Sequence, residues 1–414
     1  MAANTNTVQL VVVGLCLGMP RLGWVKPSAG ERLTDHVSLG VVTRVFPGAI
    51  VDQVIEQCGV GELRSRLLPA RATMYFVLGL ALFSTDSYDE VIRQVTSGLQ
   101  WGSGWSQPWH LPSKSALSQA RQRLGPQVVT RLFESVAKPL LVGEKVGGLI
   151  PVAVDGTVVD VPDEPGNVGE FGRPAAKQGA KAAYPQIRVV AMAECATHAM
   201  FAVALSGLAD GEQTLLPRLY TRLHPGLLLL ADRGFFSYDL WRQGLATGAQ
   251  LCWRMKKNTV LPVVEELDDG SYVSAIYPDP SSRRRRADAI AVRVVEYEVD
   301  GSLFRLATSL MDPGVASAEA LAQAYHQRWE IESSFDELKT HQGRPSLVLR
   351  SRCPDLVRQE VMAFLCVHYA IRWLMAQATS DTGVDPGRAS FVATLRSARR
   401  TIATQPGFSP HRPS

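Results

Sequence analysis

The chain of 414 residues is poor in cysteine, and its cysteines follow no pattern typical of a metal site or a disulfide framework. No two of them form a CxxC pair, and no histidine cluster accompanies them. We therefore expect neither a structural zinc site nor stabilising disulfides, and a reduced cytoplasmic compartment is the default. The six cysteines are Cys16, Cys58, Cys195, Cys252, Cys353 and Cys366.

A long uninterrupted apolar run is also missing. The apolar stretch 8–17 has no basic segment before it and no A-x-A cleavage site after it, which argues against a signal peptide. No run reaches the roughly 18 residues that a membrane helix needs, so no membrane partner is expected. The run Tyr75–Phe83 is too short for a span and predicts a buried helix.

Charge of one sign is not in large excess. The formal net charge of +4 permits a nucleic-acid partner without proving one, so local clustering of basic residues has to decide. The sequence shows no internal repeat, which excludes solenoid and propeller architectures. At this length the chain is expected to form two or three regions, each with a core.

The pattern of apolar residues divides the first half of the chain. Residues 1–30 are a weakly patterned lead-in, and residues 31–145 carry helical periodicity, which predicts a helical N-terminal domain. Its basic residues make it the candidate DNA-binding domain. Periodicity then changes, and residues 146–257 follow the order β-β-β-α-β-α-β of a mixed α/β domain. Within the helical part, Gly125 and Pro126 are expected to end one helix and start the next.

The second half begins with a β-rich stretch at residues 258–314. Its Asp-Gly pairs at 269–270 and 300–301 indicate hairpins, so we expect an insertion into the α/β domain. Helices return over residues 315–380, with Ser317 as the expected N-cap. Residues 381–414 form a tail with a short basic helix and a Pro-rich end.

Residues 325–339, YHQRWEIESSFDELK, are the most informative stretch. At about 100° per residue on a helix, its polar and aromatic members fall on one face about 100° wide. A core-facing stripe is normally aliphatic, and a solvated face rarely combines Trp with Tyr. The face is suited to a partner that is anionic and carries flat rings, which describes nucleic acid. Its members are Tyr325, Arg328, Trp329, Glu332 and Lys339.

Two aspartates stand out by their context. Asp155 lies within the apolar strand VAVDGT, and Asp232 ends the apolar run LLLLAD. A charge there is costly unless a partner or a metal compensates it. With a helix-borne carboxylate, Glu332 or Asp336, they predict a site for two hard divalent cations, Mg²⁺ or Mn²⁺, and phosphodiester cleavage. The other acids of this region are interpreted as loop or helix-cap residues: Asp160, Asp163, Asp210 and Glu212.

These residues resemble a known family. The spacing Tyr325-x2-Arg328-x3-Glu332-x6-Lys339 is similar to the signature of DDE transposases of the insertion sequence 4 family. The segments VDGTVVDVPD and LLADRGFFS resemble the first and second aspartate regions of that family, and a β-rich insertion lies between the second aspartate and the glutamate there too. The resemblance implies an RNase H-like core, interrupted by the insertion and preceded by helices.

The same resemblance implies the residues and steps of the reaction. Asp155, Asp232 and Glu332 would be the metal-binding triad, which selects Glu332 over Asp336. Cut-and-paste transposition would proceed by nicking, hairpin formation, hairpin opening and strand transfer. Tyr325, Arg328 and Lys339 would hold phosphates, and Trp329 would stack on a flipped base. A second aromatic from the insertion normally assists, and the tyrosines available there are Tyr272, Tyr277 and Tyr297.

Further basic residues are candidates for phosphate contacts, which give affinity without sequence choice. Near the second aspartate and the strand that follows, the candidates are Arg233, Arg254, Lys256 and Lys257. On the N-terminal helices, where terminal repeats would be recognised, they are Lys114, Arg121 and Arg123. The run 283–286 is either a solvated loop or a further phosphate contact.

Two alternatives to an active transposase stay open. One is an inactive or domesticated DNA-binding protein, and the other is an RNase H-like nuclease that does not join strands. The expected partners of the active enzyme are double-stranded DNA, as terminal inverted repeats and as target, and a second copy in a synaptic homodimer. Its expected location is the bacterial cytoplasm, in association with the nucleoid.

Overall fold

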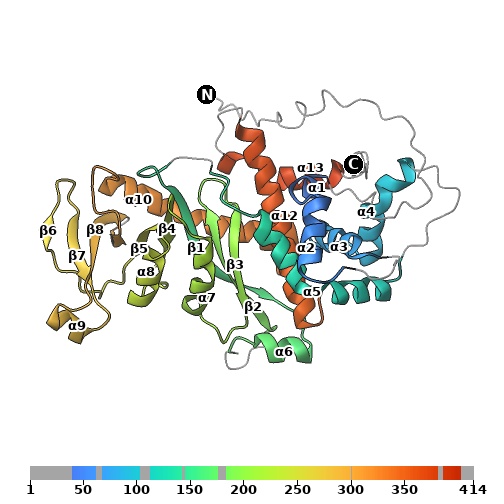
Figure 1. Ribbon diagram of the computed structural model, residues 1–414, viewed down its shortest axis with the longest axis horizontal. Coiled ribbons are helices and arrows are strands. Elements are labelled where there is room, and N and C mark those ends of the chain that lie inside the picture. Colours follow the sequence, from blue (N-terminus) through green and yellow to red (C-terminus); the bar gives the residue numbers. More distant parts are fainter. Residues whose placement is uncertain are drawn as a thin grey trace.

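The computed structural model in Figure 1 describes residues 40–61, 68–102, 112–141, 145–175, 183–299, 301–380 and 386–401. The expected lead-in at 1–30 and the Pro-rich end of the tail lie outside these residues. In Figure 1 the N-terminal helices, the central sheet and the β-rich insertion follow one another along the longest axis, with one long helix between the N-terminal helices and the sheet.

The N-terminal region is helical, as its periodicity predicted. Ser87 accepts a hydrogen bond from the Glu90 amide at 3.2 Å, which caps the fourth helix. The fifth helix bends at Gly125, whose φ of 71° only glycine adopts easily, and Pro126 restarts it as expected. The helices are α1 (Val41–Val45), α2 (Gly48–Gln57), α3 (Ala70–Leu82), α4 (Tyr88–Gly102) and α5 (Lys114–Val136).

The first five strands form the catalytic core. They are β1 (Ile150–Asp160), β2 (Gln186–Glu194), β3 (Met200–Ser206), β4 (Leu227–Ala231) and β5 (Gln250–Arg254). Their order is β3-β2-β1-β4-β5, with the first three antiparallel and β1, β4 and β5 parallel. This mixed sheet confirms the expected RNase H-like class. Its helices are α6 (Pro165–Phe171), α7 (Glu212–Leu219), the short η2 (Tyr220–Arg222) and α8 (Tyr238–Leu245).

The β-rich stretch continues the same sheet. Its elements are β6 (Glu265–Glu266), β7 (Tyr272–Ile276), α9 (Pro280–Arg285), β8 (Ile290–Val299) and β9 (Ser302–Thr308). Strand β9 pairs with β5, so the order extends to β9-β8-β7-β6 and the sheet has nine strands among the described residues. The insertion is therefore hydrogen-bonded to the core edge, and its hairpins are held in a fixed position beside the site.

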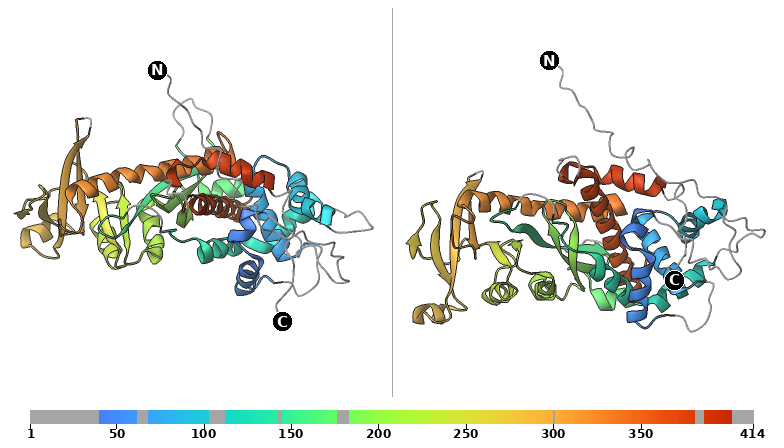
Figure 2. Two further views of the ribbon diagram at one scale, coloured as in Figure 1. Left: turned by 90° about the horizontal axis from the view of Figure 1, so that it is seen from above. Right: turned by 45° about the horizontal axis from the view of Figure 1, so that its top comes forward.

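The helical segment that carries the sequence signature follows β9. Ser317 accepts from the Ala320 amide at 3.2 Å, which confirms the expected N-cap. A 3₁₀ turn and a π-helical stretch interrupt the α-helix, and such irregular turns often occur at functional positions. The segments are α10 (Ala318–His326), η3 (Gln327–Trp329), α11 (Glu330–Asp336) and η4 (Glu337–Gly343). Figure 2 shows them running from the insertion strands toward the C-terminal helices.

The C-terminal helices complete the core. They are α12 (Pro354–Ser380), the short η5 (Pro386–Arg388) and α13 (Phe391–Thr401). By length and composition, α12 alone among the described residues is apolar enough to cross a membrane, with a mean hydropathy of 1.3. An apolar 18-residue stretch of α12 is 78% buried inside the fold, where α3 and α5 pack against this helix. A buried core helix can have the same length and composition, so α12 is weak evidence for a membrane span.

Candidate active site

The sheet brings the two aspartates together. Val154 of β1 and Ala231 of β4 are register partners on neighbouring parallel strands. Asp155 and Asp232 directly follow these partners, so both carboxylates lie at the same point of the sheet. The Asp155 Oδ1 accepts the Gly156 amide at 2.7 Å, and the Asp232 Oδ1 accepts the Gly234 amide at 2.6 Å. Each carboxylate is thereby held by a backbone amide that lies one or two residues further along the chain.

The ionisation of Asp155 is perturbed. Burial raises the pKa of this carboxyl above its usual value, and the charge of Asp232 adds to the rise. The Gly156 amide and Arg328 oppose it, but they do not cancel the effect of burial. Negative charge concentrated in a half-buried site is unfavourable without a counter-ion, so the site is expected to attract a cation.

The helical segment brings a cation and a third acid to this place. Arg328 is 5% exposed, and its Nη1 donates to the Asp155 Oδ2 at 3.3 Å. Its Nη2 lies 3.8 Å from the Glu332 Oε1, one helical turn further on. One guanidinium thus spans two of the three predicted triad carboxylates. The Glu332 side chain is 51% exposed and free to approach a ligand.

Lys339 and Tyr325 flank these residues. The Lys339 Nζ donates to the Thr157 Oγ1 at 2.9 Å, and Thr157 lies on the same face of β1 as Asp155. Tyr325 is 1% exposed, and burial raises the pKa of its hydroxyl to about 12. Among the described residues its hydroxyl has no hydrogen-bond partner, so a polar ligand at this place would satisfy it.

Trp329 differs from the rest of the face because it projects outward. It is 48% exposed, and the Arg328 guanidinium lies 5.1 Å from the centre of its ring. Of the insertion tyrosines, Tyr297 lies closest to the face: it stacks on Phe304 with ring centres 5.4 Å apart and contacts the His326 ring. Tyr272 instead bonds to Glu296, and Tyr277 lies beneath Arg283.

The donor atoms of this site suit a hard divalent cation, because Asp155, Asp232 and Glu332 offer only carboxylate oxygens. Within the described parts of the chain, no three His, Cys, Asp or Glu side chains are arranged as a complete metal site. The Arg328 guanidinium lies between the Asp155 and Glu332 carboxylates, 3.3 Å from the first and 3.8 Å from the second. A metal ion and Arg328 would compete for the same oxygens.

The other predicted phosphate contacts differ in exposure. Arg254 lies over the Phe304 ring at 3.8 Å, at the edge of the site. Lys114 is exposed and paired with Asp89 at 3.2 Å. The remaining exposed candidates are Arg233, Lys256, Lys257 and Arg123.

The interpretation of Arg121 as a DNA contact is wrong. This residue is 1% exposed, and its Nε donates to the Gln359 Oε1 at 2.9 Å. Its other nitrogens donate to Tyr88, Ser351 and the Leu356 carbonyl. Arg121 therefore joins α4 and α5 to α12, and its position in a basic helix gave no indication that it turns inward.

Glu212 was interpreted as a helix cap, but it lies against the strand of Asp155. Its carboxylate packs on Gly156 so closely that a Cβ there would overlap it, and Arg188 donates to it at 3.3 Å. Burial raises the pKa of Glu212, and the charges of Asp155 and Asp232 raise it further. No sequence pattern indicated this proximity, which arises when α7 packs on the sheet.

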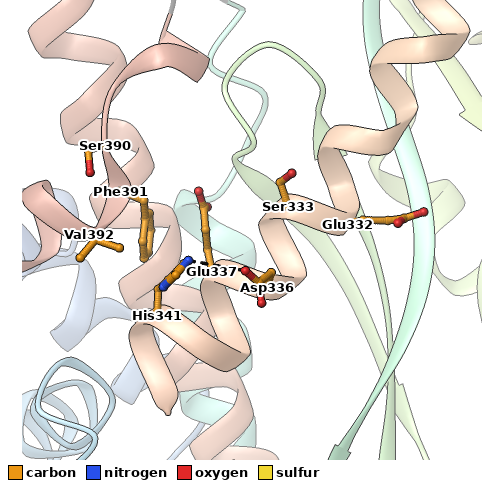
Figure 3. Close-up of a pocket in the computed structure, with 8 residues that line it drawn as sticks. All are labelled: Glu332, Ser333, Asp336, Glu337, His341, Ser390, Phe391 and Val392. Atoms are coloured by element: carbon orange, nitrogen blue, oxygen red, sulfur yellow. Dashed lines mark ion pairs between the residues drawn. The ribbon is translucent and has the colours of Figure 1, made fainter. Parts of the chain in front are cut away.

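A pocket of about 490 Å³ lies along the helix that carries Glu332, between this helix and the start of α13. Figure 3 shows Glu332 and Glu337 projecting to different sides of this helix, with the start of α13 across from Glu337. The lining residues are Glu332, Ser333, Asp336, Glu337, His341, Ser390, Phe391 and Val392. The acidic helix is thus exposed at Glu332 and packed at Glu337.

Comparisons with known proteins agree with this geometry. Residues 36–134 match the family described as Insertion element 4 transposase N-terminal, and residues 147–369 match the Transposase DDE domain. The transposase InsG for insertion sequence element IS4 of Escherichia coli is 27% identical over 372 residues, which cover 88% of this chain and 83% of that protein. The putative transposase InsZ of the same organism is 25% identical over 54% of this chain and 73% of its own length.

A solved structure, the piggyBac transposase synaptic complex with hairpin DNA, covers 88% of this chain and 79% of its own with a TM-score of 0.46 and 9% identity. No detail of the site rests on that distant similarity. The domain matches span both the helical region and the sheet that carries the aspartates. The chain belongs to the DDE transposases of the insertion sequence 4 family, enzymes that transpose insertion sequences.

Proposed function

We propose that Asp155, Asp232 and Glu332 are the catalytic carboxylates of this transposase and that they bind two divalent cations, Mg²⁺ or Mn²⁺. One observation carries the proposal: the pairing of Val154 with Ala231 aligns the two aspartates, and Arg328 links Asp155 to Glu332. When bound, such cations would activate the attacking oxygen and neutralise charge on the leaving oxygen.

The reaction proposed for the site is cut-and-paste transposition. A water oxygen forms a bond to phosphorus at the end of the element, and the 3′ oxygen leaves as a free hydroxyl. That hydroxyl attacks the opposite strand, which closes a hairpin and releases the flanking DNA. A second water opens the hairpin, and the regenerated 3′-hydroxyl joins the end to target DNA. Each step exchanges one phosphodiester bond and needs no oxidant or reductant.

The signature face would hold the DNA during these steps. Arg328 and Lys339 carry the positive charge for phosphates, and the unsatisfied Tyr325 hydroxyl is placed to donate beside them. Trp329 offers an exposed ring for stacking of an unpaired base. Tyr297 and Phe304 supply the nearest aromatic rings of the insertion.

The proposed partners are the terminal inverted repeats, the target DNA and a second copy of the chain in a synaptic homodimer. The N-terminal helices would recognise the repeats, with Lys114 and Arg123 among their exposed basic residues. The proposed location is the bacterial cytoplasm, on the nucleoid. The basic residues proposed to surround the site would attract phosphate groups, which supports a polyanionic substrate.

The test is incubation of the purified protein with the end sequence of its element and Mg²⁺ or Mn²⁺. Hairpin and joined products are expected, and Asp155→Ala is expected to abolish cleavage while DNA binding persists. Binding without any cleavage would instead support a domesticated DNA-binding protein. Nicks that never join would support a nuclease without strand transfer.

A further inference from the structure

A buried cluster outside the triad surrounds Arg372 of α12. This arginine is 2% exposed, although it lies in an otherwise apolar helix. Its Nε donates to the Glu337 Oε2 at 2.9 Å, and its Nη2 donates to the other oxygen of the same carboxylate. A buried guanidinium bound by both oxygens of a carboxylate has a fixed orientation, because the two planar groups match each other.

The same Nη2 reaches a second partner. It donates to the His198 Nδ1 at 2.6 Å, and the His198 Nε2 lies 3.0 Å from the Glu330 Oε2. Arginine can only donate, so the His198 Nδ1 accepts and its proton lies on Nε2, directed at Glu330. The His198 carbonyl also accepts from the Ser334 hydroxyl at 3.3 Å. His198 therefore connects Arg372 to the helix α11 at two points.

These contacts bracket Glu332. Glu330 is the first residue of α11, and Glu337 directly follows the last, so Arg372 holds both ends of this short helix. Within the part of the chain that the structure describes, the Glu332 carboxylate is held by a distant contact with Arg328 at 3.8 Å. Its position against Asp155 consequently depends on where the backbone of α11 lies. The π-helical turn that starts at Glu337 makes that anchoring more important, since a regular helix does not continue through it.

We propose that Arg372 is a positioning residue for transposition: through Glu337 on one side and through His198 and Glu330 on the other, it fixes α11 so that Glu332 faces the aspartates. This inference rests on the role of Glu332 proposed above. Arg372 touches neither DNA nor the reacting atoms. Its contribution is that Glu332 needs no rearrangement when the cations and the DNA bind.

Two variants test this role at different cost to the fold. Arg372→Lys keeps the charge but loses the paired donors, and it leaves the buried Glu337 poorly satisfied. His198→Asn is milder: it removes the imidazole that joins Arg372 to Glu330 and leaves the pair of Arg372 with Glu337 in place, and asparagine tolerates the positive φ of 57° found at this position. Should Arg372→Lys fail to fold, His198→Asn carries the test alone.

The readouts separate positioning from stability. Mn²⁺ binding to the DNA-free protein is followed by electron paramagnetic resonance, and kcat and KM for nicking are measured at saturating and limiting Mn²⁺. Both variants are expected to bind Mn²⁺ several-fold more weakly and to lower kcat about tenfold to a hundredfold with little change in KM, because small displacements of reacting groups have effects of that size.

The matched control is Arg121→Gln, which removes another buried arginine bound to α12 but has no contact with α11. It is expected to lower the melting temperature without altering Mn²⁺ affinity or kcat in the folded protein. Unchanged Mn²⁺ affinity and kcat in His198→Asn would overturn the inference. Asp155→Asn distinguishes this from a failure of the proposed function: a variant that still cleaved would remove the triad assignment itself.

Discussion

The Nη1 of Arg328 lies 3.3 Å from the Oδ2 of Asp155, inside the group of carboxylates proposed to bind metal. An arginine of the face proposed to bind phosphate therefore acts as the counter-ion of the acidic site. A phosphate that attracted Arg328 would release Asp155 and Glu332 for cations. DNA binding and cation binding are then coupled, each favouring the other.

This coupling predicts opposite effects of one substitution. Arg328→Gln is expected to strengthen Mn²⁺ binding to the DNA-free protein roughly threefold to tenfold, because about 1 kcal/mol of competing ion pairing is lost. DNA binding, measured by fluorescence anisotropy without metal, is expected to weaken. Arg254→Gln is the control for Mn²⁺ binding alone, since Arg254 lies over the Phe304 ring and forms no ion pair with a carboxylate of the described residues. Weaker Mn²⁺ binding in Arg328→Gln would contradict the competition.

Asp155 is expected to cost stability at neutral pH. Its pKa is raised in the folded protein, mainly by burial, so the folded state binds this proton more tightly than the unfolded state does. The free energy of unfolding of the wild-type protein therefore increases as the pH falls from the raised pKa of Asp155 toward 3.8, its ordinary value. Above that window, Asp155→Asn is expected to raise the melting temperature by about 1–3 °C while abolishing cleavage.

Thermal melts at pH 7.5 and pH 4 measure this difference. The advantage of Asp155→Asn should shrink at the lower pH, because the raised pKa of Asp155 makes its carboxyl more protonated in the folded than in the unfolded protein there. Asp239→Asn is a suitable control because the Asp239 side chain is 75% exposed. A destabilised Asp155→Asn protein at pH 7.5 would show that the contact with Arg328 outweighs the cost of burial.

Trp329→Ala is expected to separate nicking from hairpin formation. The ring is half exposed, so its loss should change stability little, whereas stacking of a base on an aromatic ring contributes about 1–3 kcal/mol. Gel analysis should show that nicks persist and hairpins decline, and a 2-aminopurine placed at the element's end should lose its stacking signal. Trp329→Phe, which keeps a flat ring, should restore part of both. Equal loss of nicks and hairpins would place Trp329 in substrate binding generally.

The residues proposed as catalytic could be named from the sequence, whereas the contacts that hold them could not. Asp155, Asp232 and Glu332 were recognisable because charges in apolar strands and a spaced motif are local signals. Arg121, Glu212 and Arg372 were not assigned their places, because partners 24 to 238 positions away in the chain decide which way a polar side chain on a helix turns. The stretch predicted to be β-rich contains strands β6 to β9, but the pairing of β9 with β5 depends on a long-range register that no local pattern encodes.

His368 is expected to make the fold sensitive to mild acid. It is fully buried and bonds to Glu337 at 3.1 Å, and burial lowers the pKa of its imidazole below 6.5. The unfolded chain therefore takes up a proton that the folded chain resists, and stability should fall as the pH drops below 6.5. Urea unfolding between pH 7.5 and 5 should show this slope, and His368→Asn should be less stable at pH 7.5 yet lose less on acidification. If the variant showed the same pH dependence of stability as the wild type, that dependence would belong to another titratable group.

Arg121 and Arg123 lie two positions apart on α5, yet opposite results are expected for them. Arg121→Gln removes the guanidinium donors whose hydrogen bonds Gln359, Ser351 and the Leu356 carbonyl accept. We therefore expect a loss of about 2–4 kcal/mol in the free energy of unfolding. Its DNA affinity, measured below the unfolding transition, should stay unchanged. Arg123→Gln should leave stability unchanged and, if this surface contacts phosphate, lower the salt dependence of DNA binding by about one unit of slope. Weaker DNA binding by folded Arg121→Gln would mean that the helix rearranges on DNA to expose this side chain.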